Sequence, residues 1–177
     1  MADATVAALQ ALRDSGRRLV IVTGRELDDL RTVLPRLDLF ERIPAENGAL
    51  LYGPETQRDR RLGDAPSENL VREIETGGVA ALSIGASILA TLEEHRHTVL
   101  AAIADLGLEN HLVSNKGALM ILPSGVNKAS GLEAALAELK LTRHNTVAMG
   151  DGENDHALLD LSECGWAVAG TVHPLSP

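Results

Sequence analysis

The stretch over residues 147–155, Val-Ala-Met-Gly-Asp-Gly-Glu-Asn-Asp, constrains the fold more than any other part of the chain. Residues 146–149 form an apolar run of the length typical of a buried parallel strand, and the residues from 154 onward have helical apolar spacing. We therefore expect Asp151 at the carboxyl end of a strand and Asp155 near the start of a helix. In open α/β sheets, ligands bind at that edge.

The residue types in this stretch suit a hard metal ion. Gly150 and Gly152 let a metal or a phosphate approach the backbone closely. Two carboxylates without a cysteine or a histidine pair favour Mg²⁺ over Zn²⁺. The alternative is that Asp151 and Asp155 serve only as turn and capping residues, because Gly-Asp-Gly is ordinary turn chemistry.

The amino-terminal third of the chain has the pattern of a parallel βαβ unit. Residues 19–22, Leu-Val-Ile-Val, are typical of a strand that is buried on both faces. A polar turn at residues 23–25 follows, and apolar residues at helical spacing then continue as far as Pro35. Strand, turn and helix in this order predict an α/β class with a Rossmann-like parallel sheet core.

The composition changes after residue 52. Residues 53–66 are polar and bounded by prolines, which is typical of a linker or a domain boundary, and the basic cluster at 58–61 is expected to be solvated. The pattern then predicts a helix at 67–76, strands within 79–92, a helix at 94–106 and short strands at 109–114 and 117–122. We therefore expect a discontinuous core, residues 1–52 and 123–177, which carries a small α+β domain over 53–122.

Charge and composition exclude several classes of protein. The formal net charge of −9 argues against a nucleic-acid partner and against an anionic membrane surface. The single cysteine, Cys164, excludes an internal disulfide and a thiolate zinc site. No apolar run reaches the length of a membrane span and no basic, then apolar, leader is visible, so a cytoplasmic location is the default expectation.

Two further residues are predicted at the same edge of the sheet. Thr23 provides a hydroxyl at the end of the first strand, and Lys128 opens the helix that follows the inserted domain. Taken alone, Thr23 could belong to a plain turn and Lys128 could be a solvated first-turn residue. Together with Asp151, they supply the hydroxyl, the fixed cation and the carboxylate-held Mg²⁺ that can hold a phosphoryl group.

At these residues the chain resembles the haloacid dehalogenase superfamily of phosphatases, in its type IIB branch of Cof-like and sucrose-phosphatase-like hydrolases. Residues 20–25 resemble the second motif of that family, Asn127 and Lys128 with Gly131 the third, and residues 150–155 the fourth; residues 46–48 match the asparagine-glycine element before the cap. The resemblance implies that residues 53–122 are a cap domain that selects a small phosphorylated metabolite.

The resemblance also assigns roles to individual residues. Thr23 would bind the transferring phosphoryl group, and Lys128 would balance the charge of nucleophile and phosphate. Asp151 would ligate Mg²⁺, with Asn154 and Asp155 completing the metal shell. Gly24, Arg25 and Asn47 would contact the substrate.

The first motif of the family, Asp-x-Asp-x-Thr, is absent from these 177 residues. Residues 3–5, Asp-Ala-Thr, follow no apolar strand and are predicted to cap a helix, and no Asp-x-Asp occurs elsewhere. A phosphoaspartyl mechanism needs that carboxylate as nucleophile, so we expect the chain to be inactive or nearly so. The alternatives are a non-catalytic binder of phosphate ligands, that is, a pseudoenzyme, and a damaged reading frame without function.

In the family, the strand of the first motif lies between the strands predicted here at 19–22 and 146–149. Its loss leaves two facing strand edges, and each unpaired buried backbone group costs about 1 to 3 kcal/mol. Three outcomes follow: the chain is a truncated hydrolase, the two strands close up, or a partner fills the gap. The tail also lacks the continuation typical of the family, so we expect a fragment at both ends. Unpaired strands favour pairing between chains, and a homodimer is a further expectation.

Overall fold

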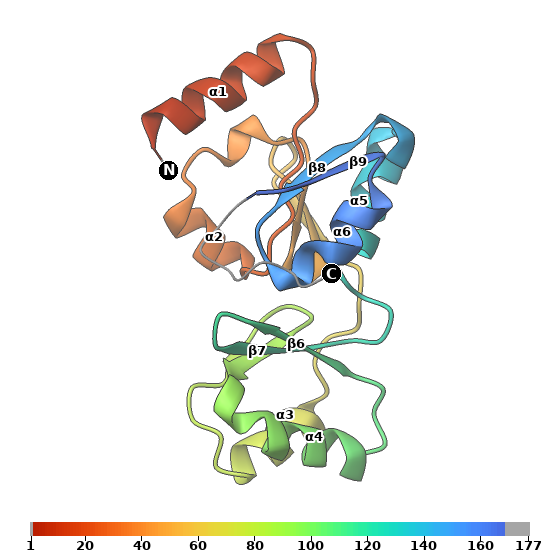
Figure 1. Ribbon diagram of the computed structural model, residues 1–177. Helices are drawn as coiled ribbons and strands as arrows, with labels where there is room; N and C mark the ends of the chain where they lie inside the picture. Colours follow the sequence, from red (N-terminus) through yellow and green to blue (C-terminus); the bar gives the residue numbers. More distant parts are fainter. Residues whose placement is uncertain (1, 169–177) are drawn as a thin grey trace.

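The computed structural model describes residues 2–168 in two lobes, stacked one above the other in Figure 1. The upper lobe contains both ends of the described chain, and the lower lobe is built from the middle of the sequence. This mixed α/β architecture confirms the predicted fold class. The predicted tail, residues 169–177, lies outside the described residues. No helix within residues 2–168 is long and apolar enough to cross a membrane.

The first half of the upper lobe packs two helices against a small sheet. Its elements are α1 (Asp3–Asp14), α2 (Leu27–Val33), the short 3-10 helices η1 (Leu37–Leu39) and η2 (Glu46–Gly48), and the strands β1 (Ile43–Ala45), β2 (Leu50–Gly53) and β3 (Arg58–Arg61). The three strands form an antiparallel sheet in the order β1-β2-β3. The expected linker therefore contains a strand, since β3 pairs with β2 along its whole length. The domain limits at residues 52 and 123 remain a prediction.

The lower lobe is a four-stranded antiparallel sheet with helices on one face. Its elements are α3 (Glu68–Thr76), β4 (Ser83–Ile84), β5 (Leu89–Leu92), η3 (Glu93–His95), α4 (Arg96–Asp105), β6 (His111–Asn115) and β7 (Ala118–Leu122). The strand order is β4-β5-β7-β6, and α3 and α4 cover the face that points away from the upper lobe (Figure 1). Leu70, Ile74, Val99 and Leu119 fill the core between the helices and the sheet. The opposite face of the sheet is turned toward the upper lobe.

The chain returns to the upper lobe through its last elements. These are α5 (Lys128–Leu139), η4 (Arg143–Asn145), β8 (Val147–Gly150), η5 (Glu153–Asp155), α6 (His156–Leu161) and β9 (Cys164–Ala167). β8 and β9 pair in parallel, and Ala148 packs inward against Leu132, Leu136 and Leu158. The order of α5, β8 and α6 therefore agrees with the prediction, and Asp151 follows β8 directly.

The predicted strand over residues 19–22 is wrong in its extent. The segment makes one isolated parallel bridge, Val20 with Arg42, and its flanking hydrogen bonds run to one side only: Glu41 N–H to Leu19 O and Thr23 N–H to Pro44 O, each 2.9 Å. Within residues 2–168 it forms no backbone hydrogen bond to β8, so the two predicted edges do not close up. Side chains still pack on both faces, because Leu19 and Ile21 contact one core cluster and Val20 and Val22 another.

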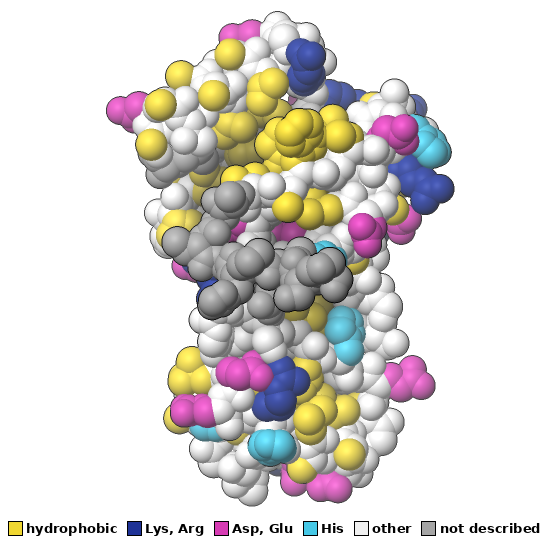
Figure 2. Space-filling view, viewed as in Figure 1, with side chains coloured by type: hydrophobic (Ala, Val, Ile, Leu, Met, Phe, Trp, Pro, Cys, Tyr) yellow, Lys and Arg dark blue, Asp and Glu magenta, His cyan; other side chains and the backbone are white. Residues whose placement is uncertain are grey.

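The parallel strand expected at residues 146–149 is present as β8, but only one of its faces is buried. Val147 and Met149 on β8 are 61% and 68% exposed, and Trp166 on β9 is 59% exposed. Val147 and Met149 alternate with the buried Ala148, and Trp166 pairs with Met149, so the three side chains lie on the same outer face of the two-stranded sheet. Figure 2 shows hydrophobic side chains gathered on this part of the upper lobe, beside α1.

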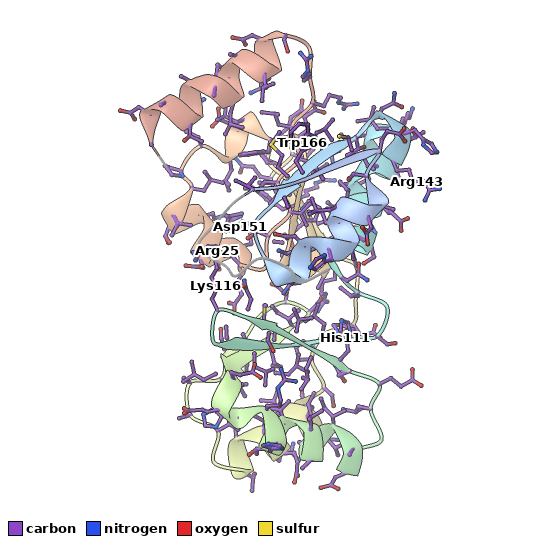
Figure 3. The ribbon with its side chains drawn as sticks, in the orientation of Figure 1. Arg25, His111, Lys116, Arg143, Asp151 and Trp166 are labelled. Carbon is purple, nitrogen blue, oxygen red and sulfur yellow. The ribbon has the colours of Figure 1, made fainter. Side chains whose placement is uncertain are left out.

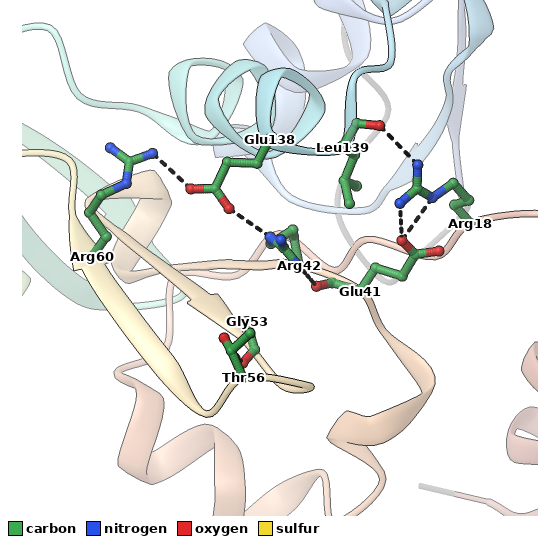
Figure 4. A network of polar contacts seen from close by, with 8 residues as sticks. All are labelled: Arg18, Glu41, Arg42, Gly53, Thr56, Arg60, Glu138 and Leu139. Carbon is green, nitrogen blue, oxygen red and sulfur yellow. Dashed lines mark hydrogen bonds and ion pairs between the residues drawn. The ribbon is translucent and has the colours of Figure 1, made fainter.

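Polar contacts fix α5 to the first sheet (Figure 4). Glu138 near the end of α5 accepts hydrogen bonds from Arg42 at 2.7 Å and from Arg60 at 3.0 Å. Arg18 bonds to the carboxylate of Glu41 and donates to the backbone oxygen of Leu139 at 2.9 Å. The basic cluster at 58–61 thus has a structural contact through Arg60, and the carboxyl-terminal end of α5 is fixed to the first sheet.

Candidate active site

A buried ion pair lies at the start of α5. Lys128 Nζ donates to Asp155 Oδ1 at 2.5 Å, and both side chains are 9% exposed. The second oxygen of Asp155 accepts the backbone N–H groups of Gly152 at 2.8 Å and Asp151 at 3.1 Å. Burial opposes ionisation of Asp155, but the hydrogen bonds from Lys128 and Gly152 outweigh it and hold the pKa below its ordinary value. Asp155 is therefore an anion that fixes the ammonium group of Lys128.

The local sequence explains why Lys128 stands at this point. Asn127 caps α5 in a capping box, since its side chain accepts from Ser130 N–H at 3.0 Å and Ser130 Oγ accepts from Asn127 N–H at 2.9 Å. The cap defines the first helical residue as Lys128. The cap therefore fixes the backbone position from which the Lys128 side chain reaches Asp155 and Asn154.

Two asparagines continue the hydrogen-bond chain from the ion pair. Asn154 Oδ1 accepts from Lys128 Nζ at 3.1 Å, and Asn154 Nδ2 donates to Asn47 Oδ1 at 3.1 Å. Asn47 is 2% exposed, and its own amide nitrogen donates to the sulfur of Met120 in the lower lobe. Lys128, Asp155, Asn154 and Asn47, which we call the polar cluster, are thus connected across three separate segments of the sequence.

Close backbone contact brings Asn47 to the start of α5. A Cβ atom on Gly131 would lie 2.5 Å from the Cα of Gly48, and one on Gly48 would lie 2.1 Å from the backbone oxygen of Asn127. Gly48 has φ of +94°, a conformation that favours glycine. No larger residue fits at either position without moving α5 away from η2. The glycines that belong to the predicted motifs therefore have a steric reason.

Residues 23–25 adjoin the polar cluster mainly through their backbone. Thr23 O accepts the N–H of Asn47 at 2.9 Å, and a Cβ on Gly24 would lie 3.2 Å from Asn47 Oδ1. Thr23 Oγ1 accepts from Arg25 N–H at 3.2 Å, so its hydroxyl hydrogen is available to a ligand. The guanidinium of Arg25 pairs instead with Asp29 on α2 at 2.5 Å and does not bond to the polar cluster.

The carboxylate of Asp151 is the exposed acidic group of the site. Its side chain is 55% exposed, and its backbone N–H is held by Asp155. Mg²⁺ commonly binds one or two protein carboxylates and completes its octahedron with waters and substrate phosphate. Asp151 fits this requirement, whereas both oxygens of Asp155 already accept hydrogen bonds and the oxygen of Asn154 accepts from Lys128. Among residues 2–168, no three His, Cys, Asp or Glu side chains cluster as a metal cage.

Two residues near the site were not predicted. Glu46 is buried beside Asn47 and pairs with no cationic side chain among residues 2–168; its carboxylate accepts the backbone N–H groups of Ala86 and Ser87 in the lower lobe, each at 2.9 Å. Lys116 at the tip of the lower lobe lies 3.5 Å from Asp151. No sequence pattern shows that the Glu46 carboxylate is buried or which way the Lys116 turn faces.

A buried cation, an exposed carboxylate that suits Mg²⁺ and a hydroxyl lie at this edge of the α/β core, and phosphoryl-handling hydrolases use groups of these kinds. A family profile described as haloacid dehalogenase-like hydrolase matches residues 83–175. A phosphoglycolate phosphatase from Haloarcula marismortui is 31% identical over 172 residues, covering 91% of this chain and 74% of that protein. An HMP-PP phosphatase from Cronobacter sakazakii is 26% identical over 216 residues, and the match covers 98% of this chain and 79% of that protein.

Solved structures show the same fold. A sugar phosphatase of haloacid dehalogenase subclass IIB superposes with a TM-score of 0.75 at 17% identity, covering 94% of this chain and 80% of that chain. The chain therefore belongs to the haloacid dehalogenase-like hydrolases, and by family resemblance it is a phosphoric monoester hydrolase.

Proposed function

We propose that the site binds the phosphoryl group of a small phosphorylated metabolite together with Mg²⁺ and belongs to a phosphoaspartyl-type phosphatase. The observation that supports this most directly is the polar cluster, in which Asp155 holds both the ammonium group of Lys128 and the backbone N–H of Asp151. The named activities of the relatives, on phosphoglycolate, HMP-PP and sugar phosphates, support a small phosphorylated substrate.

Each residue of the site has a separate role in binding the phosphoryl group. Within the described residues, Lys128 uses two of its three ammonium hydrogens, on Asp155 and Asn154, so one donor remains for a phosphoryl oxygen. Thr23 offers its hydroxyl hydrogen to another oxygen. Asp151 would hold Mg²⁺, which when bound neutralises charge on the phosphoryl group. Asp155 acts through Lys128 by orienting its ammonium group.

None of the 177 residues supplies the Asp-x-Asp carboxylates of the phosphoaspartyl mechanism. We infer that the polypeptide of this sequence binds phosphate esters but turns them over slowly or not at all, because it lacks the attacking oxygen. The second candidate function, a non-catalytic phosphate-ligand binder, rests on the same absence next to an intact polar cluster.

Turnover separates these two functions. The purified 177-residue chain is incubated with Mg²⁺ and an aryl phosphate, and release of the aryl alcohol is followed. We expect a rate indistinguishable from that of Lys128→Met, which removes the central cation. Appreciable Mg²⁺-dependent turnover by the unmodified chain that is lost in Lys128→Met would contradict the inferred inactivity and select the enzyme.

The proposal also includes a cellular location and an oligomeric state. A cytoplasmic location is supported by the exposed free thiol of Cys164, which suits a reducing compartment. A homodimer is supported by the edge of β8, which has no pairing strand on its second side within residues 2–168.

A further inference from the structure

The tip of the β6–β7 hairpin is a rigid turn that carries a lysine. Asn115 and Ala118 close the hairpin, and the two residues between them, Lys116 and Gly117, have φ of 50° and 86°. Positive φ at both central residues is typical of a type I′ turn, which matches the twist of the flanking strands. Gly117 O also accepts the N–H of Glu93 at 2.9 Å, which ties the turn to η3. The position of the Lys116 backbone is therefore well defined.

Lys116 reaches from the lower lobe to the site in the upper lobe. Its Nζ lies 3.5 Å from Asp151 Oδ2, and the two side chains are 66% and 55% exposed. Figure 3 shows Lys116 at the junction of the lobes, next to Asp151 and Arg25. An ion pair this exposed contributes little in water, so Lys116 can readily exchange Asp151 for another anionic partner.

The partner of Lys116 is Asp151, the carboxylate proposed to bind Mg²⁺, and this indicates which kind of group could pair with Lys116 in its place. If Asp151 donates its oxygens to Mg²⁺, the carboxylate no longer balances the ammonium group of Lys116. The upper lobe supplies the groups for the phosphoryl end of a substrate, so the part of the substrate beyond the ester oxygen faces the lower lobe. Within residues 2–168, Lys116 is the cationic side chain through which the lower lobe contacts a predicted site residue by an ion pair.

We propose that Lys116 is a specificity-determining residue that receives a carboxylate on the leaving-group side of the phosphate ester. The substrate class is then the phosphate esters of small hydroxy acids, of which 2-phosphoglycolate is the simplest. This inference rests on the proposed phosphate-binding function. A neutral sugar leaving group would leave the ammonium group without an anion, whereas a carboxylate forms a charge-assisted hydrogen bond.

Calorimetric titration of the full chain in the presence of Mg²⁺ tests the proposal. The two ligands are 2-phosphoglycolate and ethyl phosphate, which has a similar size but no carboxylate. We expect 2-phosphoglycolate to bind at least roughly tenfold more tightly than ethyl phosphate, as one charge-assisted hydrogen bond allows. In Lys116→Met the ratio of the two affinities falls to about one, and Lys116→Arg retains part of the preference because it keeps the charge.

Lys140→Met is the matched control. Lys140 is also exposed and has a positive φ of 56°, but it stands at the far end of α5 from the site, so its loss leaves the ratio unchanged. A preference that survives in Lys116→Met, or that is lost instead in Arg25→Met, overturns the proposal. Equal binding of both ligands by the unmodified chain also overturns it while leaving phosphate binding intact. Failure of both ligands to bind refutes the proposed function itself, and this inference falls with it.

Discussion

Replacing Lys128 by methionine removes one side of the buried ion pair and keeps the length of the side chain. Asp155 is 6% exposed and would lose its cationic partner on Oδ1, while its Oδ2 would keep the N–H groups of Asp151 and Gly152. Breaking a buried pair from one side costs about 3 to 5 kcal/mol. Because two of the three hydrogen bonds to the Asp155 carboxylate remain, we expect the lower end, about 3 kcal/mol.

Urea unfolding followed by circular dichroism measures this loss. With a slope of about 2 kcal/mol per molar urea, the midpoint for Lys128→Met falls by about 1.5 M. Asp155→Asn should cost a similar amount, and the double variant should cost about 2 kcal/mol less than the sum of the two, because the charge left unpaired in each single variant is absent. Lys140→Met is the control and should stay within about 0.5 kcal/mol of the unmodified chain.

The reasoning is refuted if Lys128→Met unfolds at the same urea concentration as Lys140→Met. It is also refuted if the two single effects simply add, since the Lys128 ammonium and the Asp155 carboxylate would then be energetically independent in spite of their 2.5 Å separation.

Three further predictions follow from other contacts. Gly131→Ala places a Cβ 2.5 Å from the Cα of Gly48, so it should lower the free energy of unfolding by about 1 to 3 kcal/mol in the same urea assay; an unchanged midpoint would show that α5 can move freely. The hydrogen bond from Arg42 lowers the pKa of Glu138 below 4.5, so the folded state binds fewer protons than the unfolded state. The stability that Glu138→Gln loses at neutral pH should therefore shrink as the pH falls below about 4.5; a loss that does not change with pH would contradict this. Light scattering after size-exclusion chromatography should give twice the chain mass of 18.7 kDa, and a monomeric mass would remove the homodimer prediction.

The local pattern of the sequence predicted most of the helices and hairpins. The helix α5 begins at Lys128, as predicted, because capping by Asn127 is a local signal. The predicted elements of the lower lobe were likewise found, since each has its own amphipathic pattern and turn residues.

The failures have a common physical cause. Residues 19–22 and 146–149 have the composition of buried parallel strands, but a strand also needs neighbours to pair with, and pairing is not encoded in the segment itself. Residues 19–22 therefore form one bridge, and Val147 remains exposed on β8. The strand β3 was missed for the converse reason: Arg58–Arg61 has a polar sequence, and its extended form depends on β2.

In the site too, residues in local motifs could be predicted from the sequence, whereas contacts between distant segments could not. Lys128, Asn154, Asp155 and Asn47 were predicted as site residues from motifs, and the structure brings them into one hydrogen-bonded cluster. The contacts made by Lys116 depend on how the lobes meet, which a single sequence does not contain.

Binding of inorganic phosphate is the most direct test of the central claim that the polar cluster and Asp151 form a Mg²⁺-dependent phosphoryl site. Calorimetry is performed on the 177-residue chain with and without Mg²⁺, and on Asp151→Asn as the variant without a metal carboxylate. We predict saturable binding that requires Mg²⁺ and is strongly weakened in Asp151→Asn, while Lys140→Met binds as the unmodified chain does. Absence of phosphate binding at any Mg²⁺ concentration, or binding that is indifferent to both Mg²⁺ and Asp151, would contradict the claim.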